Sequence, residues 1–339
     1  MATRRDFLGA TLGAGASLAL TPDLLRAVQR LQDLTLIQRA IPSSGELLPV
    51  MGLSRGNDPP GHATFTEVLR AFVDSGGRAV DMIHGWAQAE EVTGTAASAL
   101  GVQDKIFWST QLRFPQGPPP PPGTILTVEP ATVRTYVDES LARLQTKRID
   151  LMMVTTFRDT PALLRMLREH REEGRIRYIG VTGAFANQHA AVEAVMRRET
   201  IDFIGVDYAM DNRAVEQTIL PLAQERGIGV IACFPFGGNI GPDRIVASRL
   251  FRRVGDRPLP DWAAEFDATT WAQFFLKYVV SHPAVTVVRA GTTQPQHVLD
   301  NMRAGRGRLP DEAMRRRMTA YIDALPAPAG APRSSLVRA

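Results

Sequence analysis

Charged residues that could take part in catalysis follow short apolar runs of the chain. Asp81 and Arg289 each come directly after a pair of apolar residues. An unpaired buried carboxylate costs several kcal/mol, so Asp81 must accept hydrogen bonds or stay protonated. A raised pKa would make Asp81 an acid or base near neutral pH. The alternative is an ordinary carboxylate that is satisfied by Gln111 and by backbone N–H groups.

Other polar and aromatic side chains follow the same kind of run. His84 lies three residues after Asp81 and titrates near neutral pH, so it is a candidate acid or an incidental loop histidine. Arg289 could form a bidentate contact with a carboxylate or phosphate of a ligand, or a salt bridge to Asp207 or Asp211. Four aromatic residues could line a pocket here or be ordinary packing: Trp86, Phe114, Tyr208 and Phe234.

Several kinds of site are not indicated by the sequence. The six histidines form no pair at metal-ligand spacing, and the single cysteine, Cys233, excludes a disulfide framework and a cysteine-rich metal site. No Walker sequence and no Gly-x-Ser-x-Gly sequence occurs. We therefore predict no metal.

The candidate residues need a scaffold that brings distant segments together. From about Leu34 onward, β-type runs alternate with helical stretches such as 132–144, which predicts βα units and a parallel sheet. The predicted strands are 50–53, 78–82, 105–110, 150–155, 178–181, 203–206, 229–233 and 285–289. Eight strands with no Gly-x-Gly-x-x-Gly after the first predict a (β/α)8 TIM barrel, preceded by a β-hairpin over 35–39 and 46–50. Catalytic residues of such barrels lie at the carboxyl ends of the strands.

The N-terminal residues 1–30 are predicted to be an export signal. Arg4-Arg5 with Phe7-Leu8 and a weakly apolar run to Leu20 is typical of a twin-arginine signal, and the run is too short to span a membrane. The alternative is an amphipathic helix that begins with two arginines. We expect an exported, periplasmic protein with the barrel over 31–325 and a flexible tail over 326–339.

Composition limits the partners. The 339 residues are 44% hydrophobic, which is enough for a large core, and no segment offers about 20 apolar residues for a membrane span. The net charge of +4 is scattered, so we expect a small-molecule ligand rather than nucleic acid. The proline run 118–122 follows the third strand and is either a surface insertion or a lid for substrate.

Six stretches of the chain resemble the aldo/keto reductase superfamily. The first five are IPSSGE from Ile41, LPVMGL from Leu48, RIDLM from Arg148, EGRIRYIGVT from Glu173 and SHPAVT from Ser281. The sixth opens with Gly291-Thr292-Thr293 and ends at Asn301. The resemblance covers Leu34 to about Leu325. It implies a (β/α)8 barrel with an N-terminal hairpin and the reduction of carbonyl compounds with NADP or NAD.

The resemblance also implies a catalytic tetrad of Asp, Tyr, Lys and His. Asp81 keeps the first position, whereas Trp86, Gln111 and Thr155 stand where the tyrosine, lysine and histidine are expected. An indole N–H is a donor only and is no proton acid near neutral pH. Arg289 is then a candidate for the missing cation. His84 or Asp81 would replace the tyrosine as acid.

The same resemblance identifies the residues expected to hold the cofactor. They are Thr182, Tyr208, Phe234, Phe236, Gly237, Gly291, Thr292, Thr293 and Asn301. Tyr208 would stack on the nicotinamide, the glycine-rich loop would wrap the pyrophosphate, and Asn301 would contact the adenine. The N-terminus of the last helix favours phosphate. Gly183 and Gly205 lack side chains that the family uses to hold the nicotinamide. The alternative is therefore that this protein no longer binds the cofactor.

The sequence thus leads to three functional hypotheses. The first is a divergent reductase-like protein that binds a nicotinamide dinucleotide and a small carbonyl or hydroxyl compound. The second is a cofactor-independent lyase, isomerase or hydrolase with Asp81 as base and Arg289 as anion anchor. The third is a binding protein that keeps only the scaffold.

Overall fold

The computed structural model describes residues 35–54, 62–82, 87–112, 127–155, 159–183, 186–240, 245–246 and 248–326. From Leu36 onward these residues belong to one compact unit. Some predictions fall outside the described residues. They concern the signal segment 1–30, His84, Trp86, Phe114, the proline run 118–122 and nearly all of the tail 326–339.

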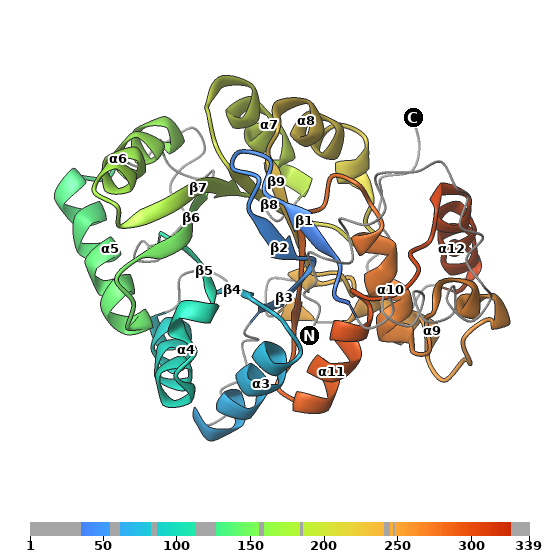
Figure 1. Cartoon of the computed structure of the whole chain (residues 1–339). Coiled ribbons are helices and arrows are strands. Elements are labelled where there is room, and N and C mark those ends of the chain that lie inside the picture. Colours follow the sequence, from blue (N-terminus) through green and yellow to red (C-terminus); the bar gives the residue numbers. More distant parts are fainter. Residues whose placement is uncertain are drawn as a thin grey trace, which may run out of the picture. The chain divides into compact units, whose positions relative to one another are not determined.

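Parallel strands close into a barrel in the order β12-β3-β4-β5-β6-β7-β8-β9 (Figure 1). The strands are β3 (Met51–Ser54), β4 (Ala79–Asp81), β5 (Phe107–Gln111), β6 (Ile149–Thr155), β7 (Ile176–Thr182), β8 (Phe203–Asp207), β9 (Gly229–Cys233) and β12 (Val287–Gly291). The predicted (β/α)8 barrel is therefore confirmed, and every predicted run overlaps an observed strand. Lys105 was predicted to start a strand but belongs to a 3-10 turn, Gln103–Lys105.

Helices surround the barrel (Figure 1). They are α3 (His62–Asp74), α4 (Ala87–Leu100), α5 (Pro130–Leu144), α6 (Thr160–Glu172), α7 (His189–Arg198), α8 (Ile219–Arg226), α9 (Arg249–Val254), α10 (Trp271–Val280), α11 (Pro295–Arg303) and α12 (Glu312–Ala324). In α5, Val133, Val137 and Leu144 are buried as their helical spacing predicts. None of the described helices is long and apolar enough to cross a membrane.

An antiparallel hairpin precedes the barrel, as predicted. It consists of β1 (Gln38–Ala40) and β2 (Leu47–Pro49), while β10 (Asn239–Ile240) and β11 (Ile245–Val246) form a second small ribbon. Glu46 in the hairpin turn forms ion pairs with Arg78 and Arg177, which lie at the amino ends of β4 and β7. The hairpin is therefore attached to the amino-terminal end of the barrel, opposite the end where catalysis is expected.

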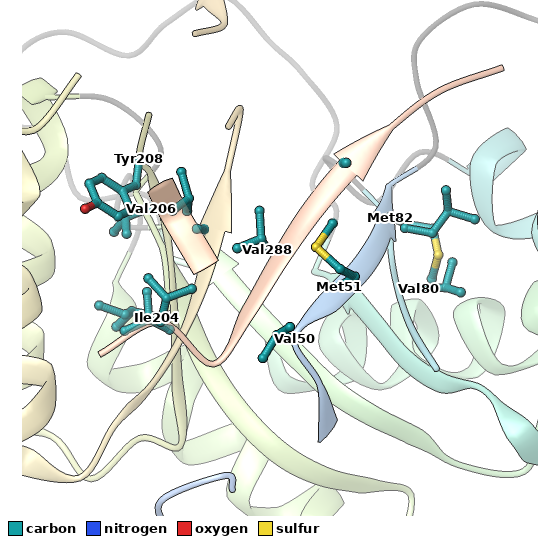
Figure 2. Packing of buried hydrophobic residues seen from close by; sticks show 14 of the residues in the cluster. Val50, Met51, Val80, Met82, Ile204, Val206, Tyr208 and Val288 are labelled. Atoms are coloured by element: carbon teal, nitrogen blue, oxygen red, sulfur yellow. The ribbon is translucent and has the colours of Figure 1, made fainter. Parts of the chain in front are cut away.

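Two sets of side chains alternate along the barrel strands. The outer set packs against the helices, and Figure 2 shows members of it on β4, β8 and β12, among them Val80, Ile204 and Val288. The inner set fills the barrel with Phe107, Tyr178 and Phe203, whose ring centroids lie 5.9–6.2 Å apart. This aromatic cluster makes the amino-terminal half of the barrel a solid core.

Candidate functional site

The inner face of the barrel becomes polar toward the carboxyl ends of the strands. Successive residues of a strand point to opposite faces, so side chains two apart share a face. Asp81 is two residues after the inner residue Ala79, Asp207 is four after Phe203, and Arg289 is two after Val287. Each of the three charged groups therefore points into the barrel.

Asp81 and Arg289 form a buried ion pair. Arg289 Nη1 contacts Asp81 Oδ2, and both side chains are 3% exposed. The hydroxyl of Ser109, on the neighbouring strand β5, donates a hydrogen bond to Asp81 Oδ1. The partners of Asp81 among the described residues are thus Ser109 and Arg289, and the predicted bond from Gln111 is not formed. The predicted salt bridge of Arg289 to Asp207 or Asp211 is also wrong.

The strand register explains why this pair forms. Arg289 on β12 is in register with Gly52 of β3, and Asp81 on β4 is in register with Ser54 of β3. The two charged residues therefore differ by two residues in level and lie on alternate strands, with β3 between them. In a tilted eight-stranded barrel, this offset places side chains from alternate strands in one layer. Sequence order could not reveal the contact, because β4 and β12 are 208 residues apart at Asp81 and Arg289.

Burial changes the electrostatics of the pair. Removal from water lowers the pKa of Arg289 to about 9, while the adjacent carboxylate favours the charged guanidinium. Arg289 Nη1 and Asp81 Oδ2 are thus each other's partner in the buried pair.

Polar residues continue above this pair toward the mouth of the barrel. The same register argument places Ser54, Gln111, Thr182 and Cys233 in the next layer, and Thr155 with Asp207 in the layer after it. Ser54 Oγ has no hydrogen-bond partner within the described part of the chain. The Thr182 hydroxyl donates to the Gly205 carbonyl at 3.3 Å. Three of the four predicted tetrad positions, Asp81, Gln111 and Thr155, thus face one polar interior.

Asp207 is a site residue that sequence reasoning treated only as a partner for Arg289. Its side chain is 7% exposed, and burial raises its pKa to about 7. One of its oxygens, Oδ1, has no partner among the described residues, and the only cation close enough to favour its charge is Arg249. An acidic residue that ends an apolar strand was the available signal, the same one that singled out Asp81.

The loop after β9 holds an aromatic ring at the mouth of the barrel. Phe234 follows Cys233, is partly exposed and packs against the inner cluster. Its backbone is left-handed, with φ of 52°, which is unfavourable for a bulky residue. A Cβ on Gly238 would lie 2.6 Å from the Phe234 ring, so glycine is needed there.

Contacts with Asp211 and Arg249 hold the rest of this loop in place. Gly237 has φ of 74°, and a Cβ there would lie 2.8 Å from Asp211 Oδ1. Arg249 donates to both oxygens of Asp211, at 2.6 and 3.1 Å, and to the Gly238 carbonyl at 3.3 Å. Phe236 packs on Phe251 of α9. The predicted pyrophosphate loop is therefore a rigid turn over an ion pair.

The remaining predicted cofactor residues lie around the start of α11. Gly291 ends β12 and is exposed, and Thr292 and Thr293 are partly exposed between it and the helix. The Thr292 hydroxyl accepts from the Gln294 N–H at 3.1 Å. Asn301 lies about two helix turns further on and is 7% exposed. The segment thus brings a strand end, two hydroxyls and a helix N-terminus together.

Tyr208 does not fit its predicted stacking role. The residue has no exposed surface and belongs to the outer set shown in Figure 2. Its ring packs with those of Tyr278 and His282, and its hydroxyl bonds to Glu216 and Arg315. Alternation explains the result, because Asp207 points inward and its neighbour must point outward. The exposed aromatic face at the mouth belongs to Phe234 instead.

No metal centre is found where the chain is described: no group of three or more His, Cys, Asp or Glu is placed to hold an ion. Cys233 is fully buried, and burial together with Asp207 raises the pKa of its thiol, so it is not a reactive thiolate. Lys277 is also buried, but its ammonium donates to the Arg306 and Arg308 carbonyls rather than to a group of the site.

Comparison with known proteins gives concordant results. A family model described as the aldo/keto reductase family matches residues 50–322. The holo form of aldo-keto reductase AKR11C1 from Bacillus halodurans superposes with a TM-score of 0.65 at 23% identity, over 85% of this chain and 96% of that chain. An aldo/keto reductase from Klebsiella pneumoniae in complex with NADP and acetate gives a TM-score of 0.62 at 21% identity, over 82% and 93% of the two chains. At these identities the likeness to the solved structures shows the fold.

Proposed function

Because the chain belongs to the aldo/keto reductase family, we propose that it binds a nicotinamide dinucleotide together with a small carbonyl or hydroxyl compound. We further propose that it interconverts the two oxidation states without the Asp-Tyr-Lys-His mechanism of the family. The observation that carries the proposal is Phe234, held at the barrel mouth in a strained left-handed conformation. Backbone strain of this kind persists where the surrounding structure enforces it, and it is concentrated at functional sites.

The residues present fit such a cofactor. Phe234 offers a flat apolar face for a ring, and Gly237 and Gly238 leave the loop backbone bare of side chains, so that a phosphate can approach. Gly291, Thr292 and Thr293 lead into α11, whose N-terminus carries a partial positive charge. We assign the nicotinamide end to Phe234 and Thr182 and the adenine end to Asn301. When bound, the cofactor would supply or accept hydride.

In this chemistry, residues of the chain would stabilise the negative charge that develops on the substrate oxygen. Reduction of a carbonyl places negative charge on its oxygen, and a preorganised cation lowers the energy of that state. The Arg289 guanidinium is the cation that the structure directs into the barrel, and Asp81 with Ser109 orients it. The ion pair also keeps Asp81 charged, so Asp81 is a positioning residue here rather than the proton donor.

The proposal is tested by titrating the purified protein with NADPH and following tryptophan fluorescence and binding heat. We expect saturable binding. Phe234→Leu should weaken it about fivefold, since loss of an aromatic contact costs about 1 kcal/mol. Phe251→Leu is the matched control, because Phe251 packs behind the loop on Phe236 and Phe275.

Two outcomes would contradict the proposal. Absence of NADPH binding at millimolar concentration would discard redox chemistry. Equal weakening by Phe234→Leu and Phe251→Leu would show that loop packing, not a ring contact, controls affinity. Turnover of a small hydroxy acid or ketone without cofactor would instead favour a non-redox enzyme, for which Ser54 Oγ and the Asp81–Arg289 pair provide polar contacts.

We also propose that the N-terminal segment exports the protein to the periplasm. The support is the Arg4-Arg5 pair with the following apolar run. Replacing both arginines by lysine should retain the protein in the cytoplasm. Unchanged distribution between cell fractions would contradict export by the twin-arginine route.

A further inference from the structure

We infer that Asp207 is the proton-transfer residue of this barrel, the group that protonates the substrate oxygen in place of the tyrosine that the family resemblance implies. The inference rests on the proposed function and deepens it. Its starting point is the position of Asp207 as the last residue of β8, with its side chain on the inner face of the barrel. Carboxyl ends of barrel strands are where catalytic groups occur.

The strand register gives Asp207 a defined neighbour. Thr155 is in register with Thr182, and Thr182 with Gly205, so Asp207 is two levels above Thr155 and on the next strand but one. Arg289 and Asp81 have this same offset in the same direction, and their side chains touch. Asp207 and Thr155 therefore share the outermost layer, at the position where the resemblance expects a histidine.

The surroundings of Asp207 leave its carboxyl group free to exchange a proton. On β9, Cys233 faces it with a buried, neutral thiol. In the loop after β8, the Asn212 side chain donates to it, and Asp211 lies nearby but is bonded to Arg249. No Lys, Arg or His of the described residues lies within ion-pair distance of Asp207. Its Oδ1 atom has no hydrogen-bond partner among them either.

The contrast with Asp81 decides which carboxylate has this role. Asp81 touches a guanidinium and accepts from Ser109, so its charged form is favoured. Asp207 has neither contact, and burial raises its pKa to about 7, which suits a general acid near neutral pH. One carboxylate then holds the cation in place, and the other carries the proton.

The step balances as follows. Hydride from a reduced nicotinamide dinucleotide forms the new C–H bond, and the C=O π pair moves onto oxygen. That oxygen takes the proton of the Asp207 carboxyl group, whose O–H bonding pair stays on the carboxylate. Solvent reprotonates Asp207 at the barrel mouth. In the oxidation direction, the Asp207 carboxylate takes the hydroxyl proton.

The test combines a titration of the free protein with kinetics of the full chain. In protein with 13C-labelled aspartate carboxyls, the resonance that Asp207→Asn removes should titrate near the pKa of about 7. With NADPH and 4-nitrobenzaldehyde as probe, Asp207→Asn should lower kcat about 100-fold and abolish the fall in rate above neutral pH. NADPH affinity should be unchanged, and Asp207→Glu should restore part of the rate with a shifted pH profile.

The matched control is Asp202→Asn. Asp202 precedes the other end of the same strand and accepts from the Ile179 N–H at 3.0 Å, so it makes the same charge change away from the mouth. This variant should keep the pH profile of the unmodified protein.

Normal NADPH binding together with an Asp207 carboxyl that titrates near the ordinary value of about 4 would overturn this inference alone. Failure to bind NADPH would overturn the proposed function and this inference with it. If Asp207→Asn does not fold, the resonance of the unmodified protein is assigned through Asp207→Glu, which also removes it from the spectrum of aspartate-labelled protein.

Discussion

The two ends of the barrel are built from the same strands and differ in how completely their polar groups are satisfied. At the amino-terminal end, Asp150 accepts from the Trp108 N–H and from Arg177, both at 2.8 Å, and Tyr178 donates to Ser44 at 2.8 Å. At the carboxyl end, Ser54 Oγ and Asp207 Oδ1 have no hydrogen-bond partner among the described residues.

This difference separates stability from function within one fold. Saturated hydrogen bonds and the aromatic cluster of Phe107, Tyr178 and Phe203 fix the amino-terminal half. Incompletely bonded polar groups cost free energy, and proteins retain them where a ligand or a proton uses them. The amino-terminal end therefore contributes stability, and the carboxyl end holds the polar groups on which the proposed chemistry depends.

The largest expected effect comes from breaking the buried ion pair. Arg289→Met should destabilise the protein by about 3–5 kcal/mol, because it leaves the Asp81 charge buried and unpaired. Adding Asp81→Asn should recover most of that loss, since the orphaned charge is then removed. Urea unfolding measures both variants, and a double variant as unstable as Arg289→Met would show that packing rather than charge fixes this layer.

The next effect depends on pH and distinguishes Asp207 from ordinary buried carboxylates. Burial raises its pKa from 3.8 to about 7, so the folded protein binds the proton more tightly than the unfolded chain does. Stability from this group is present at low pH and is lost as the pH rises toward neutrality. Asp207→Asn should remove that loss, gaining roughly 4 kcal/mol relative to the unmodified protein between about pH 4 and pH 8.

Thermal or urea unfolding of both proteins across this pH range provides the check. Asp202→Asn serves as the reference, because it removes a carboxylate from the other end of β8. A constant difference in stability between Asp207→Asn and the unmodified protein would mean that Asp207 titrates as it does in the unfolded chain.

The smallest effect is expected at the hairpin. Glu46 joins the hairpin to the barrel through Arg78, Arg177 and Tyr178, and its side chain is 21% exposed. Glu46→Gln should cost about 1–2 kcal/mol, because partial exposure moderates the loss of charged hydrogen bonds. Ligand affinity should not change. A change in NADPH affinity larger than the change in stability would contradict the separation of the two ends.

Much of the fold was predictable from sequence because its signals are local. Alternating β-type runs and amphipathic windows predicted the barrel and the hairpin, and the family resemblance singled out Asp81, Gln111 and Thr155 as site positions. The ends of strands were less exact, as at Lys105, where a 3-10 turn precedes β5. The predicted direction of the Tyr208 side chain was wrong. Tyr208 comes one residue after the inward-facing Asp207, so its ring lies on the outer face of the barrel.

By itself, the sequence determined which residues reach the carboxyl end of the barrel, since hydrophobic patterning fixes the strands and the topology fixes their order. Which of those residues meet was decided only by the tertiary structure. Barrel closure places β12 beside β3, and strand tilt offsets alternate strands by two residues. Closure and tilt bring Arg289 to Asp81 and leave Asp207 with no ion pair among the described residues, because both depend on contacts between segments far apart in the chain.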